Sequence, residues 1–102
     1  MMYGLTDKQL VQIRQVLSRT PRLERAILFG SRAKGTNHPG SDVDLALFGE
    51  SFALRDRFRL DNDLDDLDLP FTFDLLLYDQ LTNPALRDHI DRVGVTLYEQ
   101  TS

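Results

Sequence analysis

The sequence predicts a single α+β domain, with a small mixed sheet of about four strands flanked by helices. Two observations support this. Segments with apolar residues at helical spacing alternate with short, continuous apolar runs that are typical of strands. The chain has 102 residues, which is the length of one domain, 1–102, with one core.

Helices are predicted over three segments. The first covers residues 7–19 and begins with a capping box between Thr6 and Gln9. The second lies within residues 51–67. Its predicted buried stripe consists of Leu54, Phe58, Leu60, Leu64 and Leu67. The third has Asn83 as its N-cap, before Pro84.

Strands are predicted where apolar residues run without interruption. These segments are residues 23–29, 43–48, 71–78 and 95–98. Between the first two, the turn-rich segment 36–41, which contains Pro39, is predicted to be a loop. Gly94 is expected to end the last helix as its C′ residue.

Aspartates crowd the segment 61–68. They are Asp61, Asp63, Asp65, Asp66 and Asp68. A calcium loop needs glycine at its sixth position and glutamate at its twelfth, and this chain has Asp66 and Thr72 there. We therefore interpret the run as a solvated acidic face, with docking of a partner as the second interpretation.

Charge and composition restrict the function. The formal net charge of −4 argues against a grip on a long polynucleotide, because phosphate contacts dominate that affinity. The chain has no apolar run long enough for a membrane span and no apolar signal core at its start. It also has no cysteine, so a reducing cytoplasm is the expected compartment.

Three features suggest a phosphate and metal site. Gly30 and Ser31 follow an apolar strand; Gly30 allows close backbone approach, and Ser31 is the expected N-cap of a short turn whose N–H groups face an anion. An ordinary Gly-Ser turn is the alternative. Asp42 and Asp44 point to the same face of a strand, where like charges need a cation between them.

The third feature is Asp74, which interrupts a later apolar run. A buried carboxylate without a partner is costly. A metal shared with Asp42 and Asp44 would supply that partner, and a salt bridge to an arginine is the alternative.

These residues occur in a known order. Gly30-Ser31, ten residues and then Asp42-Val43-Asp44 resemble the signature of the DNA polymerase β-like nucleotidyltransferase superfamily. With its short length and its ending, Gly94-Val95-x-Leu97-Tyr98, the chain is similar to minimal nucleotidyltransferases, which are often antitoxin partners of HEPN-domain toxins. The resemblance implies a polymerase β-like fold.

The resemblance also implies roles for individual residues. Gly30 and Ser31 would contact the triphosphate of ATP, and Asp42 and Asp44 would bind two Mg²⁺ ions. Asp74 would complete the second metal site and help to deprotonate the attacking hydroxyl. Arg32 and Lys34 are further candidates for phosphate contact, although the family pattern does not specify them.

The implied function is the transfer of AMP from ATP to a tyrosine of a HEPN RNase toxin. This modification would silence the toxin, as in a type VII-like toxin–antitoxin pair. Two alternatives are an antitoxin that masks its toxin without catalysis, and a nucleotidyltransferase for small molecules of the aminoglycoside type. The absence of a second domain argues against the small-molecule enzyme.

Overall fold

The first helix, α1 (Asp7–Ser18), begins at the predicted capping box. The Thr6 N–H donates to Gln9 Oε1 at 3.0 Å, and the Gln9 N–H donates to Thr6 Oγ1 at 3.1 Å.

The computed structural model describes residues 2–38 and 40–101. Pro39, which belongs to the predicted loop 36–41, therefore lies outside the described residues.

The described strands form one mixed sheet. Their bounds are β1 (Arg25–Phe29), β2 (Val43–Phe48), β3 (Phe73–Leu77) and β4 (Val95–Glu99). The order across the sheet is β3-β2-β1-β4. β1 pairs antiparallel with β2 and β4, whereas β2 pairs parallel with β3. The predicted α+β class with a mixed sheet is confirmed.

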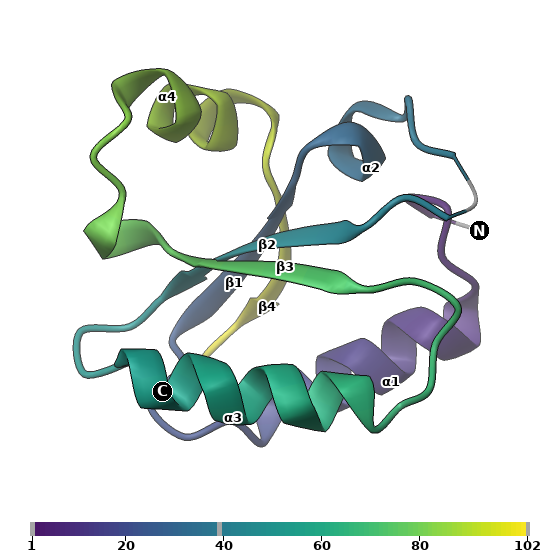
Figure 1. The fold of residues 1–102 in the computed structure, drawn as a ribbon, viewed down its shortest axis with the longest axis horizontal. Helices are drawn as coiled ribbons and strands as arrows, with labels where there is room; N and C mark the ends of the chain where they lie inside the picture. The colour runs from purple at the N-terminus through teal and green to yellow at the C-terminus, as the bar shows by residue number, and fades with distance from the viewer. Residues whose placement is uncertain (1, 39, 102) are drawn as a thin grey trace.

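Helices cover both faces of this sheet (Figure 1). The other helices are α2 (Ser31–Lys34), α3 (Leu54–Asp65), the 3₁₀ turn η1 (Tyr78–Gln80) and α4 (Pro84–Val93). α1 and α3 lie together on one face, and α4 lies on the other (Figure 1). No helix in the described ranges is long and apolar enough to cross a membrane.

Strand β2 shows how side chains are divided between the two faces. Val43, Leu45 and Leu47 are buried in the large core with α1 and α3. Ala46 alternates with them and packs with Ile90 of α4 in a smaller core. By the same alternation, Asp44 belongs to the α4 face of the sheet.

The predicted apolar stripe of α3 is only partly correct. Leu60 is fully buried and Leu64 is 1% exposed, but Leu54 is 48% exposed and Phe58 is 55% exposed. Phe58 and Leu60 are two positions apart, which is roughly 200° around a helix, so they cannot share one face. The five aspartates of segment 61–68 are all exposed, as predicted.

Helix α4 begins as predicted and ends differently. Asn83 Oδ1 accepts hydrogen bonds from the Ala85 and Leu86 N–H groups. Gly94 has φ −64° and extended geometry, so it is not the left-handed C′ residue that the sequence suggested. Glycine is needed there for space, because a Cβ would collide with the Ile27 side chain and the Ile90 carbonyl.

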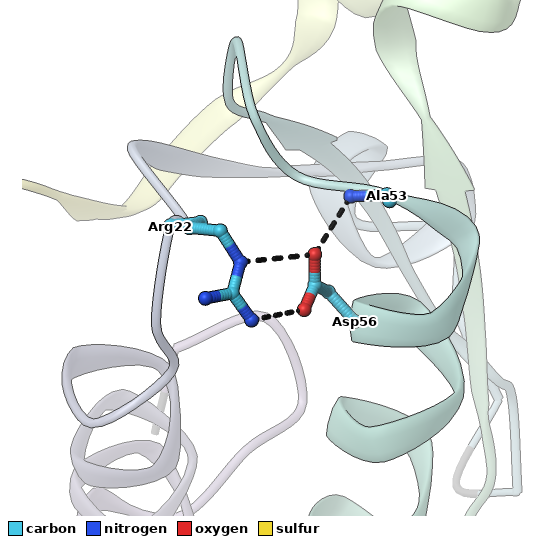
Figure 2. A network of polar contacts seen from close by, with 3 residues as sticks. All are labelled: Arg22, Ala53 and Asp56. Carbon is cyan, nitrogen blue, oxygen red and sulfur yellow. Dashed lines mark hydrogen bonds and ion pairs between the residues drawn. The ribbon is translucent and has the colours of Figure 1, made fainter.

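A polar contact fastens the start of α3 to the segment before β1 (Figure 2). Arg22 donates through Nε and Nη2 to the two carboxylate oxygens of Asp56. Asp56 Oδ2 also accepts from the Ala53 N–H at 2.8 Å. The hydrogen bonds from Arg22 and from Ala53 lower the pKa of Asp56 to about 2.

This contact predicts a pH dependence of stability. Because the pKa of Asp56 is depressed on folding from 3.8 to about 2, its contribution is present above pH 3.8 and is lost as the pH falls through about 2. We expect Asp56→Asn to have a lower thermal midpoint than the wild type at pH 6 and a smaller loss between pH 4 and pH 2. Thermal unfolding followed by circular dichroism measures both, with Asp63→Asn, exposed on the same helix, as control. Parallel acid profiles of the wild type and Asp56→Asn would contradict this.

Candidate active site

The parallel pairing of β2 with β3 brings together two of the three predicted carboxylates. Asp44 and Asp74 are direct partners in the register. Asp42 precedes Asp44 by two positions at the entrance to β2. All three residues therefore lie at the end of the sheet where the parallel strands β2 and β3 begin.

Asp74 does not sit in the environment that the sequence suggested. Its side chain is exposed, whereas the sequence placed it inside a buried apolar run. β3 is an edge strand, and Asp74 lies on the α4 face of the sheet, alternating with the buried Leu75. The buried residues of the run, Leu75 and Leu77, lie on the opposite face, in the core with α3.

Asp44 is half-buried between these charges. Burial raises the pKa of Asp44, and the carboxylates of Asp74 and Asp42 raise it further. Arg32 acts in the opposite direction. The three carboxylates carry more negative charge than Arg32 offsets, and this electrostatic arrangement suits a bound cation.

The donor chemistry fits Mg²⁺, which prefers carboxylate oxygens. In the described residues, however, no three His, Cys, Asp or Glu side chains are arranged to hold a metal ion. Asp42 Oδ1 instead accepts a hydrogen bond from Thr72 Oγ1 at 2.6 Å. Ligation would therefore require the aspartate side chains to rotate towards a common point.

The Gly30–Ser31 turn lies directly against these carboxylates. Gly30 has φ +76°, which an L side chain rarely adopts, and a Cβ there would collide with Asp44 Oδ2. Glycine thus lets the backbone lie beside the Asp44 carboxylate. Gly30 itself is the N-cap of α2, and Ser31 is the first helical residue, so the prediction of Ser31 as N-cap is wrong.

The turn offers backbone donors. In the described ranges, no hydrogen bond uses the N–H groups of Ser31, Arg32 or Ala33. The first N–H groups of a helix have no partner within it. Three adjacent donors could hold a phosphate group, and the carboxylates beside them would hold a cation that offsets its charge.

Arg32 has a different place from the other phosphate candidates. Its side chain is 1% exposed, and its guanidinium donates to the Ser41 carbonyl through Nε at 3.1 Å and Nη2 at 2.7 Å. Nη1 donates to the Tyr3 carbonyl at 2.9 Å, and the group lies over the Phe71 ring. Arg32 therefore ties the loop before Asp42 to the N-terminal segment, while Lys34 is exposed.

His89 is a site residue that the sequence analysis missed. Its Nε2 accepts a hydrogen bond from the Gly30 N–H at 3.2 Å, and its ring makes a T-shaped contact with the Phe29 ring, with centroids 6.2 Å apart. The two residues are far apart in sequence, and α4 carries His89 to the turn. No local pattern marks a lone histidine on a helix, so only the tertiary structure reveals this contact.

His89 is expected to position the turn for nucleotide binding. Because one hydrogen bond contributes about 1 kcal/mol, we expect His89→Ala to weaken binding of a magnesium–ATP analogue roughly fivefold. His89→Gln, whose amide oxygen can accept from the Gly30 N–H, should recover most of that loss. Isothermal titration calorimetry measures the affinities, and Asp88→Ala on the same helix is the control. Equal affinities of His89→Ala and the wild type would contradict the role.

Comparisons with known proteins define the class. The family described as "Polymerase beta, Nucleotidyltransferase" matches residues 11–102. The chain belongs to this nucleotidyltransferase family, and the observed helices and mixed sheet match its fold. No protein of curated function matches the sequence.

Solved structures share the fold. A toxin–antitoxin crystal structure with AMP-PNP matches with a TM-score of 0.68 and 24% identity, over 94% of this chain and 75% of that chain. An MNT antitoxin bound to the tri-AMPylated HEPN toxin of Shewanella oneidensis matches with a TM-score of 0.62 and 20% identity, over 94% of this chain and 74% of that chain. A Sulfolobus solfataricus protein described as a nucleotidyltransferase matches with a TM-score of 0.55 and 18% identity, over 91% of this chain and 82% of that chain.

Proposed function

We propose that this chain transfers AMP from ATP to a tyrosine hydroxyl of a HEPN-domain toxin and thereby acts as its antitoxin. The observation that carries the proposal is the pairing of Asp44 with Asp74 beside the Gly30–Ser31 turn. The similar complexes with AMP-PNP and with an AMPylated HEPN toxin support the donor and the acceptor. ATP as donor is consistent with a cytoplasmic reaction.

Each residue has a proposed part in holding the donor. The N–H groups of Ser31 to Ala33 bind the β- and γ-phosphates, and Lys34 adds a positive charge at the exposed end of α2. Asp42, Asp44 and Asp74 are the proposed ligands of two Mg²⁺ ions. When bound, such ions stabilise the charge on the entering and leaving oxygens.

The transfer itself is one displacement. The tyrosine oxygen forms a bond to the α-phosphorus, the bond from that phosphorus to the α,β-bridging oxygen breaks, and pyrophosphate leaves. In this proposal the hydroxyl proton passes to the carboxylate of Asp74, which is exposed on the edge strand β3, and from there to water. The other residues of the site align the donor for attack.

The test is incubation of the purified chain with magnesium–ATP and a HEPN-domain protein, with any HEPN-domain protein encoded next to this chain as the first choice. Intact-mass spectrometry should show the addition of one AMP per modified tyrosine, and peptide mapping should locate it on tyrosine. Absence of any mass gain in the HEPN-domain protein would overturn the proposal. If an aminoglycoside replaces the HEPN-domain protein as acceptor and becomes adenylylated, the small-molecule alternative is favoured instead.

The masking alternative has one observation in its favour, which is the exposure of Leu54 and Phe58 on α3. Protection of cells separates the two functions. If catalysis is required, Asp44→Asn should fail to protect cells from the toxin even when it forms the complex. Full protection by Asp44→Asn would favour masking.

A further inference from the structure

A groove runs along the open edge of the sheet next to the candidate active site. It has a volume of about 350 Å³ and lies between α3, β3 and the segment after β3. Its walls include Leu54, Arg57, Asp74, Leu76 and Leu81. Asp74 therefore belongs both to the carboxylate cluster and to this α3–β3 groove.

The strand that borders the groove has an unprotected edge. Apart from its pairing with β2, no backbone hydrogen bond of the described residues involves β3. Its sequence, Phe-Asp-Leu-Leu-Leu, contains no proline or lysine, which commonly protect edge strands. The opposite edge strand, β4, pairs with β1 through an irregular register and carries Thr96 and Glu99. Of the two edge strands in the described residues, β4 has its Leu97 carbonyl occupied by Arg14 Nε, whereas β3 has an apolar run and free backbone groups that another chain could extend.

Helix α3 presents apolar side chains on the same side. Leu54 lines the groove, and Phe58 lies one helical turn further along the same stripe. Arg57 covers part of the Phe58 ring, with its guanidinium carbon 4.9 Å from the ring centroid. These exposed side chains are not needed for the core, which α3 reaches through Leu60 and Leu64.

The charge changes along the edge. At the start of β3, a second hollow of about 310 Å³ is lined by Asp61, Asp65 and Asp68 together with Phe73. Phe73 and Asp74 are consecutive residues of β3 whose side chains lie on opposite faces, so the acidic hollow and the α3–β3 groove border the same edge strand from its two sides. A chain lying along this edge would encounter apolar contacts at one end and negative charge at the other.

We propose that the α3–β3 groove docks the segment of the acceptor protein that carries the hydroxyl. The segment is extended and lies beside β3, with an apolar side chain against Leu54 and Leu81 and basic side chains towards the acidic hollow. The acceptor hydroxyl then lies at Asp74. This inference rests on the proposed function and adds where, and in which conformation, the acceptor binds.

Surface substitutions test the proposal without threatening the fold. Leu54→Glu and Phe58→Glu place a negative charge on exposed positions of the groove side. Val11→Glu is the matched control, because Val11 is 52% exposed and lies beside the opposite edge strand, β4. Steady-state adenylylation of the HEPN-domain protein gives kcat and KM for each variant, and calorimetry gives the affinity for a magnesium–ATP analogue.

We expect Leu54→Glu and Phe58→Glu to raise the KM for the acceptor about tenfold, which is 1.4 kcal/mol, without changing the nucleotide affinity. Val11→Glu should behave as the wild type does. An unchanged acceptor KM in both groove variants, or an equal effect of Val11→Glu, would overturn the docking site. If Phe58→Glu only converts a dimer of this chain into a monomer, the groove is an interface between copies, and the proposal is also overturned.

The same experiment separates this inference from the proposed function. Failure of the wild type to adenylylate the acceptor overturns the function and, with it, the acceptor site. Transfer by the wild type with undiminished transfer by both groove variants overturns the docking site alone.

Discussion

Replacing Asp44 by asparagine is expected to reduce AMP transfer at least about 10³-fold, which corresponds to about 4 kcal/mol of transition-state stabilisation. Asp44 is the cross-strand partner of Asp74 and follows Asp42 by two positions, and its pKa is raised by burial and by both of these carboxylates. Asparagine keeps the shape but removes the charge that attracts Mg²⁺. Single-turnover transfer to the HEPN-domain protein measures the loss.

Without metal, the same substitution should raise the stability of the fold, although it lowers activity. Because the pKa of Asp44 is raised on folding, the folded state favours the protonated form, and stability falls as the pH rises from 3.8 through the raised pKa. At neutral pH, Asp44→Asn removes this penalty, so its thermal midpoint without metal should be higher than that of the wild type. Magnesium should stabilise the wild type more than the variant.

Asp63→Asn is the matched control, because Asp63 is an exposed aspartate on α3 outside both the carboxylate cluster and the groove. It should retain transfer and show the wild-type response to magnesium. Activity of Asp44→Asn within tenfold of the wild type would exclude Asp44 as a metal ligand. A lower metal-free midpoint for Asp44→Asn would contradict the electrostatic argument.

Local sequence signals predicted most of the fold. The capping box at Thr6 and the Asn83-Pro84 start depend on neighbouring residues only, and both are confirmed. The strand 43–48 is confirmed at its predicted bounds because a short apolar run beginning after a turn has few other solutions. The signature also predicted that Asp44 and Asp74 lie side by side, and the strand register confirms this.

The predictions fail where the burial of a side chain depends on the position of its strand in the sheet or on which face of a helix it occupies. Asp74 is exposed because β3 is an edge strand, and strand order is not a property of the local sequence. Leu54 and Phe58 follow helical spacing but point away from the core, since two apolar stripes compete on α3. His89 meets Gly30 across a long sequence separation, which no spacing rule records.

The two cationic residues of α2 also could not be distinguished from the sequence alone. Both Arg32 and Lys34 follow the Gly30–Ser31 turn, and charge alone makes both candidates for phosphate contact. The structure separates them, because Arg32 is buried among carbonyl acceptors and Lys34 is exposed. Their substitutions should therefore affect different quantities.

Arg32→Leu is expected to lower the free energy of unfolding by about 2–4 kcal/mol, because the Ser41 and Tyr3 carbonyls lose their charged donors. For a domain of this size, that loss corresponds to a fall of at least about 10 °C in the thermal midpoint. Arg32→Lys should recover little of this stability, since an ammonium group cannot reproduce the paired hydrogen bonds from Nε and Nη2 to the Ser41 carbonyl. Chemical and thermal unfolding without nucleotide measure both effects.

Lys34→Leu is the paired control on the same turn. It should leave the thermal midpoint within about 2 °C of the wild type, because exposed substitutions change stability little. It should weaken magnesium–ATP binding several-fold by removing a charge near the phosphates. If Arg32→Leu instead keeps full stability and loses only nucleotide affinity, then its guanidinium contacts phosphate directly and is not the tie between the loop and the N-terminal segment.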